Sequence, residues 1–208
     1  MLRILLEPPI RTWKVADLQN AAGVSLGHVS NVRKLLLDHE WASVVEGGLR
    51  VTEPEGLLRE WGKVYKPLSQ IRGSFYTPLH GERLEHAIRL SMANDRGRHA
   101  LLASFSAARW LAPYTRQGTY YFYADHIGQQ LVKDSMKLEP IAKGENVVIQ
   151  EPKENDVFIG KVESAEGIWC TGPVQTWLDL NASGERGVEA AEHLLQYKLL
   201  PAWREIAS

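Results

Sequence analysis

The chain has 208 residues, of which 44% are hydrophobic and 24% are charged. These fractions are typical of a globular protein that is large enough for two modest domains. No stretch approaches the roughly 20 apolar residues that cross a bilayer, and the short apolar start before Glu7 cannot form the core of a signal peptide. A single cysteine, Cys170, excludes an intramolecular disulfide and fits a reducing compartment. We therefore expect a cytoplasmic protein that makes no use of a membrane, with Cys170 packed and unreactive.

Charge is unevenly distributed although the net charge is only −1. Residues 1–66 contain nine Lys and Arg against eight Asp and Glu, and residues 67–120 contain seven against three. The remainder, residues 121–208, contains eight basic and fourteen acidic residues. Nucleic-acid phosphates attract basic surfaces, so any phosphate contact is expected from the first 120 residues.

The first 66 residues have the pattern of helices followed by a hairpin. A short helix over 2–6 is ended by Pro8, and a second over 14–22 is ended by Gly23. Ser25 can cap a third helix that runs through residue 37. Two short strands within 42–52 are joined at Gly47 and Gly48, and a further helix is expected over 55–64.

The helices over 14–22 and 25–37 have the spacing of a helix-turn-helix, and the hairpin after them would be its wing. The inward side chains that would pack the two helices together are Leu18, Ala22, Val24, Val29 and Val32. Gln19 departs from this pattern, because it stands where a small residue often lets the helices approach closely. The sequence thus predicts an N-terminal winged helix-turn-helix whose recognition helix spans about 25–37.

A recognition helix presents its outward N-terminal residues to base edges in the major groove. Here those residues are His28, Ser30 and Asn31, and Asn31 could pair with adenine. Arg33 and Lys34 follow where phosphate contact is expected, and the hairpin adds Arg50. The complete predicted DNA-contacting set is Ser25, Gly27, His28, Ser30, Asn31, Arg33, Lys34 and Arg50. We expect double-stranded DNA as the partner.

Helices and strands alternate beyond a predicted domain boundary near 67–74, where Pro, Ser and Gly interrupt the pattern. We therefore predict a mixed α/β protein with a winged helix-turn-helix domain at 1–70 and an α/β domain at 71–208. The expected strands are 101–105, 119–123, 147–150, 157–159 and 168–170. The expected helices are 81–93, 107–111, 127–136, one beginning at Pro173, and 185–200, with a turn over 94–97.

Gln175 and Asp179 lie one helical turn apart after Pro173, so their side chains share a face. With Arg186 they could form a polar cluster. A structural role is the other interpretation, in which Asp179 bonds the backbone of the turn over 181–184 while Trp177 and Leu178 pack on the sheet. The tryptophans at 110, 169, 177 and 203 are expected in the core.

Two stretches together resemble one family, the AbiEi-type antitoxins of type IV toxin–antitoxin systems. The first runs from Trp13 to Ser30, and the second from Gly172 to Leu180 with its continuation over 184–192. The resemblance implies a winged-helix domain that represses its own operon and an α/β domain needed for antitoxin action. It also implies a functionally paired nucleotidyltransferase toxin that is not bound directly. The DNA-contacting role passes only to residues 25–34, and no role is assigned to residues 175–179.

Enzyme motifs are missing from the sequence: it contains no phosphate-binding loop, no dinucleotide fingerprint and no Gly-x-Ser-x-Gly elbow. His80 and His86 beside two glutamates are more typical of a charged helix surface than of a metal site. Asp156, Lys161 and Glu163 stand in the wrong order for a nuclease motif. We expect no catalytic residue, metal or cofactor. The alternative to a DNA-binding regulator is a protein-interaction module that uses the winged helix and the acidic C-terminal domain without specific DNA binding.

Overall fold

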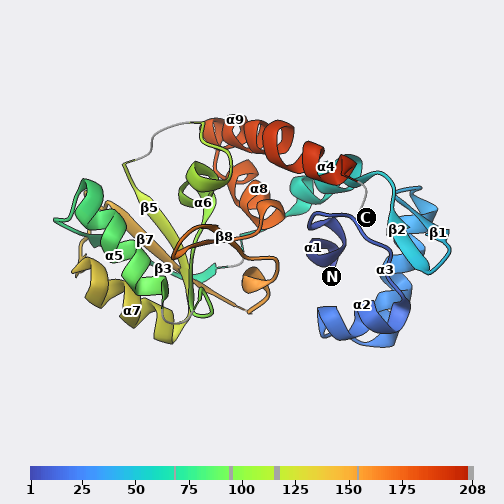
Figure 1. Cartoon of the computed structure of the whole chain (residues 1–208), viewed down its shortest axis with the longest axis horizontal. Helices are drawn as coiled ribbons and strands as arrows, with labels where there is room; N and C mark the ends of the chain where they lie inside the picture. Colours follow the sequence, from blue (N-terminus) through green and yellow to red (C-terminus); the bar gives the residue numbers. More distant parts are fainter. Residues whose placement is uncertain (68, 94–95, 115–117, 154, 206–208) are drawn as a thin grey trace. The chain divides into compact units, whose positions relative to one another are not determined.

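The computed structural model describes residues 1–67, 69–93, 96–114, 118–153 and 155–205 (Figure 1). The chain divides into two compact units. One comprises Met1–Tyr65 together with Leu195–Ser208, and the other comprises Lys66–Leu194. We call them the N-terminal unit and the C-terminal unit. Within the described ranges, none of the helices combines the length and apolar character needed to cross a bilayer.

The N-terminal unit is mainly helical, and both ends of the chain contribute to it. Helix α1, near the start of the chain, is joined to α10, near its end. The indole Nε1 of Trp203 in α10 donates a hydrogen bond to the carbonyl oxygen of Leu6 in α1 at 2.7 Å. Trp203 is buried, as expected for a core tryptophan. The elements of this unit are α1 (Leu2–Leu6), α2 (Val15–Ala22), α3 (Leu26–Asp38), β1 (Ala42–Val45), β2 (Gly48–Val51), α4 (Pro54–Val64), the π-helical η2 (Leu195–Leu199) and α10 (Leu200–Arg204).

The C-terminal unit is built on a seven-stranded mixed sheet with the strand order β6-β3-β7-β5-β4-β9-β8. Its strands are β3 (Ser69–Tyr76), β4 (Ala100–Leu102), β5 (Tyr120–Ala124), β6 (Glu139–Pro140), β7 (Val147–Pro152), β8 (Val162–Ala165) and β9 (Ile168–Cys170). Its helices are α5 (Gly81–Ala93), α6 (Ser104–Leu111), α7 (His126–Met136), the 3₁₀ turn η1 (Asn155–Phe158), α8 (Pro173–Asn181) and α9 (Glu185–Leu194). The predicted mixed α/β class is confirmed.

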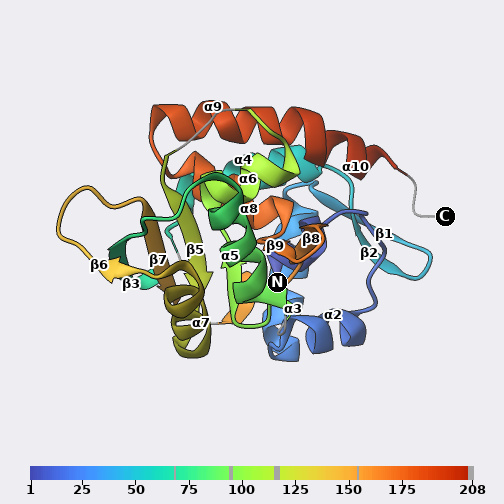
Figure 2. The same ribbon diagram turned by 60° about the vertical axis from the view of Figure 1, so that its left-hand side comes forward.

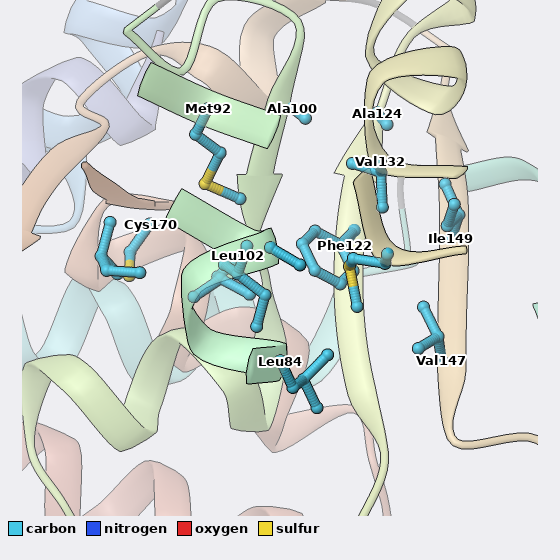
Figure 3. Packing of buried hydrophobic residues seen from close by; sticks show 14 of the residues in the cluster. Leu84, Met92, Ala100, Leu102, Phe122, Ala124, Val132, Val147, Ile149 and Cys170 are labelled. Carbon is cyan, nitrogen blue, oxygen red and sulfur yellow. The ribbon is translucent and has the colours of Figure 1, made fainter. Parts of the chain in front are cut away.

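The two faces of this sheet differ because successive side chains of a strand point to opposite sides. The first face carries the larger apolar core, in which Phe122, Leu102 and Ile149 pack with residues of α5 and α7 (Figure 3). The second face carries Tyr121 and Tyr123, which pack with Ala103 and η1. Figures 1 and 2 show α5 and α7 on one side of the sheet and α6 and α8 on the other.

Several strands differ from their predicted positions. The strand expected over 101–105 was wrong at its end, because β4 stops at Leu102 and α6 begins at Ser104. The strand expected over 157–159 was also wrong, because Val157 and Phe158 lie in the 3₁₀ turn η1 and Ile159 follows it in a turn. Strands β3, β6 and β8 were not predicted. In the turn expected over 94–97, residues 94 and 95 lie outside the described residues.

The last helix runs further than predicted. It was expected over 185–200, but α9 passes at Leu195 into the π-helical segment η2 and then into α10, which ends at Arg204. A π-helical turn is wider than an α-helical one, so backbone N–H and C=O groups that lose their α-helical partners there must bond to other groups. The change of helix type coincides with the point at which the chain passes from the C-terminal unit to the N-terminal unit.

Gly128, in the first turn of α7, provides a test of this packing. A Cβ atom at this position would lie 1.9 Å from the carbonyl oxygen of His99. Gly128→Ala is therefore expected to lower the free energy of unfolding by about 1–3 kcal/mol, since the backbone must shift. Urea denaturation measures the change. Gly118→Ala is the control, because no described residue beyond its chain neighbours comes within 4 Å of the point where its Cβ would stand. Equal stability of the two variants would contradict the packing.

Cys170 should be chemically inert in the folded chain. It is fully buried, and burial raises the pKa of its thiol to about 12. The thiolate is the reactive form, so iodoacetamide should modify the native chain on the order of a hundredfold more slowly than the urea-unfolded chain. Raising the pH from about 7 to 9 should not remove this protection, because both values lie below the raised pKa. Mass spectrometry of the alkylated protein measures both rates, and equal rates would refute the inference.

Candidate nucleic-acid interface

Helices α2 and α3 are joined by a short turn that local side chains specify. Gly23 ends α2 with the left-handed φ of 63°, which glycine adopts without steric cost. Ser25 then caps α3, because its Oγ accepts a hydrogen bond from the backbone N–H of His28 at 3.2 Å. The predicted end of α2 at Gly23 and the predicted capping of α3 by Ser25 are confirmed.

The inward side chains hold α2 against α3. Leu18 of α2 and Val29 of α3 are fully buried, as is Leu36 further along α3. The other residues expected at this contact are half-buried: Ala22, Val24 and Val32. Gln19, which departs from the usual small residue, is also half-buried, so the contact between α2 and α3 accommodates its longer side chain.

The side of α3 opposite the buried residues carries a polar ridge. Successive residues of a helix are roughly 100° apart, which places Gly27, Asn31 and Lys34 in line on the side opposite Val29 and Leu36. All three are exposed. We call this line of three residues the α3 ridge.

The other predicted contact residues of α3 differ in how far they are exposed to solvent. Ser25, His28 and Ser30 are exposed near the start of α3. Arg33 is half-buried and, by its helical position, lies on the side of Val29. The start of α3 therefore brings five of the predicted residues to solvent, Asn31 among them, while Arg33 can reach outward only through its long side chain.

The hairpin after α3 is fixed to the segment before α2. Trp13 and Leu49 form an antiparallel bridge, with N–H···O bonds of 2.8 and 2.9 Å. Gly48 permits this approach, because its φ is 142° and a Cβ there would lie 2.1 Å from the carbonyl oxygen of Trp13. In the hairpin Val45 pairs with Gly48 across a two-residue turn, and Arg50 pairs with Ser43. Arg50 is half-buried.

The cations around α3 are available to an external anion. In the part of the chain that the structure describes, no carboxylate lies within ion-pair distance of Arg33, Lys34 or Arg50. By contrast, Arg59 of α4 pairs with Glu55 at 2.9 Å. Exposed acidic residues limit the basic surface, however, since Asp38 follows Lys34 by one turn.

Sequence reasoning missed Lys14 as a member of this surface. Lys14 is exposed and stands at the N-cap of α2, next to the bridge that holds the hairpin. Its neighbour Arg11 is exposed and lies 4.6 Å from the centroid of the Trp13 ring. The signal that could have identified Lys14 is its position directly before the first helix of the pair, where helix-turn-helix proteins contact the DNA backbone.

In the C-terminal unit, Gln175 and Asp179 do form a buried polar cluster. Oδ1 of Asp179 accepts hydrogen bonds from Nε2 of Gln175 at 2.8 Å and from the hydroxyl of Tyr123 at 3.0 Å. The backbone carbonyl of Asp179 accepts from Oγ of Ser183 at 2.6 Å. The side chain of Arg186 is exposed and makes no hydrogen bond or ion pair with any described residue, so the third expected member is not part of the cluster.

The residues weighed as enzyme or metal sites do not converge. Across the described ranges, no three His, Cys, Asp or Glu side chains gather as a metal site requires. Nζ of Lys161 donates to the carbonyl oxygens of Arg96 and Gly97 at 2.9 Å each. This lysine therefore holds a turn of the backbone.

Comparison with known proteins identifies the C-terminal unit. A family model described as a transcriptional regulator, the AbiEi antitoxin of a type IV toxin–antitoxin system, matches residues 50–200. No curated protein and no solved structure matches the chain. The matched range begins within β2, so it leaves out α2, α3 and β1. A role for these elements in DNA binding is therefore inferred from their geometry alone.

Removing the cap of α3 should destabilise the interface helix. Ser25→Ala abolishes the hydrogen bond to the N–H of His28 and is expected to lower the free energy of unfolding by about 1 kcal/mol. Ser30→Ala is the matched control, because Ser30 is exposed within the same helix and bonds no described side chain or loop. Thermal unfolding followed by circular dichroism compares the two. A loss of stability in Ser30→Ala as large as that in Ser25→Ala would count against the capping role.

Proposed function

Because this chain belongs to the AbiEi antitoxin family of type IV toxin–antitoxin transcriptional regulators, we propose that its N-terminal unit is a winged helix-turn-helix that binds double-stranded DNA. In this proposal, Met1–Tyr65 together with Leu195–Ser208 form the DNA-binding domain, and Lys66–Leu194 form the α/β antitoxin domain. The DNA site lies in the promoter of its own operon. Bound there, the protein blocks the access of RNA polymerase and represses its own synthesis.

The observation that carries the proposal is the α3 ridge. The major groove of B-DNA admits an α-helix, whose outward side chains can then hydrogen-bond to base edges. Gly27 has no side chain, and the space beside it is open. A Cβ atom added there would come no closer than 4.0 Å to Oγ of Ser25. Asn31 and Lys34 follow it along the same line, so the ridge combines close approach, hydrogen bonding and positive charge.

The proposed contacts follow from the chemistry of these side chains. Asn31 can donate to N7 and accept from N6 of an adenine in the major groove. His28 and Ser30 stand beside it and complete the base-reading group. Lys34 and Arg33 neutralise phosphates on the groove edges, while Lys14 and Arg50 contact the backbone from the start of α2 and from the hairpin.

The C-terminal unit is proposed to act in antitoxin function without catalysis. Its partner would be a nucleotidyltransferase toxin encoded nearby, neutralised without direct binding, as the family resemblance implies. The protein would work in the cytoplasm, where both DNA and toxin are present. No metal or cofactor takes part in this proposal.

A protein-interaction role is a second candidate, because apolar side chains are also exposed near the ridge. Leu26 and Leu35 of α3 are 54% and 47% exposed, and Val44 of the hairpin is 58% exposed. Such residues contribute to protein interfaces when they lie together. The dependence of binding on salt separates the two roles, since phosphate contacts weaken steeply as salt rises and apolar contacts do not.

The first test is binding of the full chain to its own upstream promoter DNA across a salt series, measured by fluorescence anisotropy. Lys34→Ala should reduce the slope of log affinity against log salt by about 0.9, because one phosphate contact is lost. Asn31→Ala should weaken specific binding by about 1–3 kcal/mol and relax the preference for one base pair. Lys63→Ala on α4 removes the same charge from a lysine that pairs with Glu60, and it should leave the slope unchanged.

Each result separates the candidate functions. If Lys63→Ala reduces the salt slope as much as Lys34→Ala does, α3 is not the binding element. If no promoter DNA binds specifically at low salt, the repressor role is excluded. A partner protein that binds the same surface with little salt dependence would then support the interaction role.

A further inference from the structure

A polar cavity of about 330 Å³ lies on the second face of the sheet in the C-terminal unit. Its floor is formed by Arg72 of β3, Gln150 of β7 and Tyr123 of β5, which are neighbours in the register of these three strands. Tyr121 lies two residues before Tyr123 and faces the same side. The cavity is therefore built across the sheet, and its volume is within the usual range of small-molecule sites.

The start of α6 forms one wall of this cavity and offers backbone donors. The N–H of Ala103 bonds the carbonyl oxygen of Tyr121, and the N–H of Ser106 bonds that of Ala103. Between them, the N–H groups of Ser104 and Phe105 have no acceptor among the described residues. Both residues line the cavity. Free N–H groups at a helix N-terminus, together with the helix dipole, favour an anion.

The side chain of Ser104 points independently to a ligand. Ser104 is only 6% exposed and lines the cavity, yet its Oγ bonds no other group in the part of the chain that the structure describes. Since protein encloses the rest of the residue, the cavity is the place where this hydroxyl can find a partner. The residue also has a φ of 48°, a left-handed conformation that a side chain disfavours. A ligand oxygen at this point would use the hydroxyl and the two N–H groups together.

The rest of the cavity suits the organic part of such a ligand. The rings of Phe105 and Tyr121 line it with their centroids 6.1 Å apart and their planes inclined at 45°, and each ring offers an apolar face. The carboxyl group of Asp179, the amide of Gln150 and the guanidinium of Arg72 supply acceptors and donors. Arg72 also lies 3.7 Å from Glu145, but both side chains are partly exposed and such pairs are weak.

We propose that this cavity binds a nucleoside monophosphate. The phosphate lies at the start of α6 on Ser104 Oγ and the N–H groups of Ser104 and Phe105. The carboxyl group of Asp179 repels a phosphate placed beside it, so the base lies toward Asp179, with its face against the rings of Phe105 and Tyr121. This site is separate from the α3 ridge, and the proposal does not depend on DNA binding.

The test is isothermal titration of the full chain, without DNA, with the ribonucleoside monophosphates of adenine, guanine, cytosine and uracil and with the four nucleosides. At least one monophosphate should bind with a Kd below about 1 mM, and its nucleoside should bind at least about tenfold more weakly. Ser104→Ala should weaken the monophosphate about tenfold, because it removes a hydrogen bond to a charged group.

Two further variants make the result decisive. Ala182→Trp places a large side chain at the exposed rim of the cavity and should abolish binding while the chain stays folded. Ser135→Ala is the matched control, because Ser135 lies on α7, outside the lining of the cavity, so the loss of its hydroxyl leaves the site intact. Its affinity should change by less than about twofold.

The proposal is overturned if none of the four monophosphates binds at about 10 mM, a concentration that reveals even weak sites. It is also overturned if a nucleoside binds as tightly as its monophosphate, or if Ser104→Ala keeps the native affinity and melting temperature. Should Ser104→Ala fail to fold, the nucleoside comparison and Ala182→Trp decide the outcome. If the chain binds a monophosphate but does not bind its promoter DNA, the repressor role is refuted and the proposal for the cavity is unaffected.

Discussion

The hydrogen bonds of the Asp179 side chain hold helix α8 to the second face of the sheet. A carboxyl group is costly to bury unless it is hydrogen-bonded, and only 7% of Asp179 is exposed. Gln175, one turn earlier in α8, and Tyr123 of β5 both donate to the same oxygen. Because one partner lies on the helix and the other on the sheet, the cluster fixes α8 at this position over β5. The cavity beside it takes its shape from this arrangement.

The N-terminal unit depends on a comparable constraint in its backbone. The bridge between Trp13 and Leu49 ties the hairpin to the segment that enters α2. It can form only because Gly48 has no Cβ, which would collide with the carbonyl oxygen of Trp13. The hairpin therefore cannot move independently of the start of α2. Lys14 and Arg50, one on each side of this bridge, are held close to one another in the fold by backbone hydrogen bonds, which are stiffer than side-chain contacts.

The sequence predicted those elements that are specified by residues adjacent in the chain. Gly23 and Ser25 specify their turn through φ and a side-chain cap, and both were found from sequence. Strand β3 was missed because residues 67–74 resemble a linker in composition. Gly73, however, lies in that strand under the ring of Phe75, where a Cβ would come within 2.5 Å of the ring. In this position glycine makes room for an aromatic neighbour and does not mark a domain boundary.

Sites that depend on strand register could not be predicted. An apolar run from Leu101 suggested a strand through Phe105, yet the left-handed backbone at Ser104 turns the chain into α6. The cavity requires Arg72, Gln150 and Tyr123 to be neighbours, although they come from three separate segments. Nothing in the spacing of these residues indicates their proximity. The set on α3 was accessible from sequence because all but one of its members lie on a single helix, with Arg50 alone on the hairpin.

The near-neutral charge of the chain also affects how its proposed DNA site would work. Lys34 and Arg50 have no carboxylate partner among the described residues, but Asp38 and Glu46 are exposed close to them in sequence. Non-specific affinity for DNA comes almost entirely from neutralised phosphates, so a surface with few free cations binds random DNA weakly. Base contacts from Asn31 and its neighbours would then provide a larger share of the total affinity. A repressor with this balance would spend little time on unrelated DNA, which would suit the proposed control of a single operon.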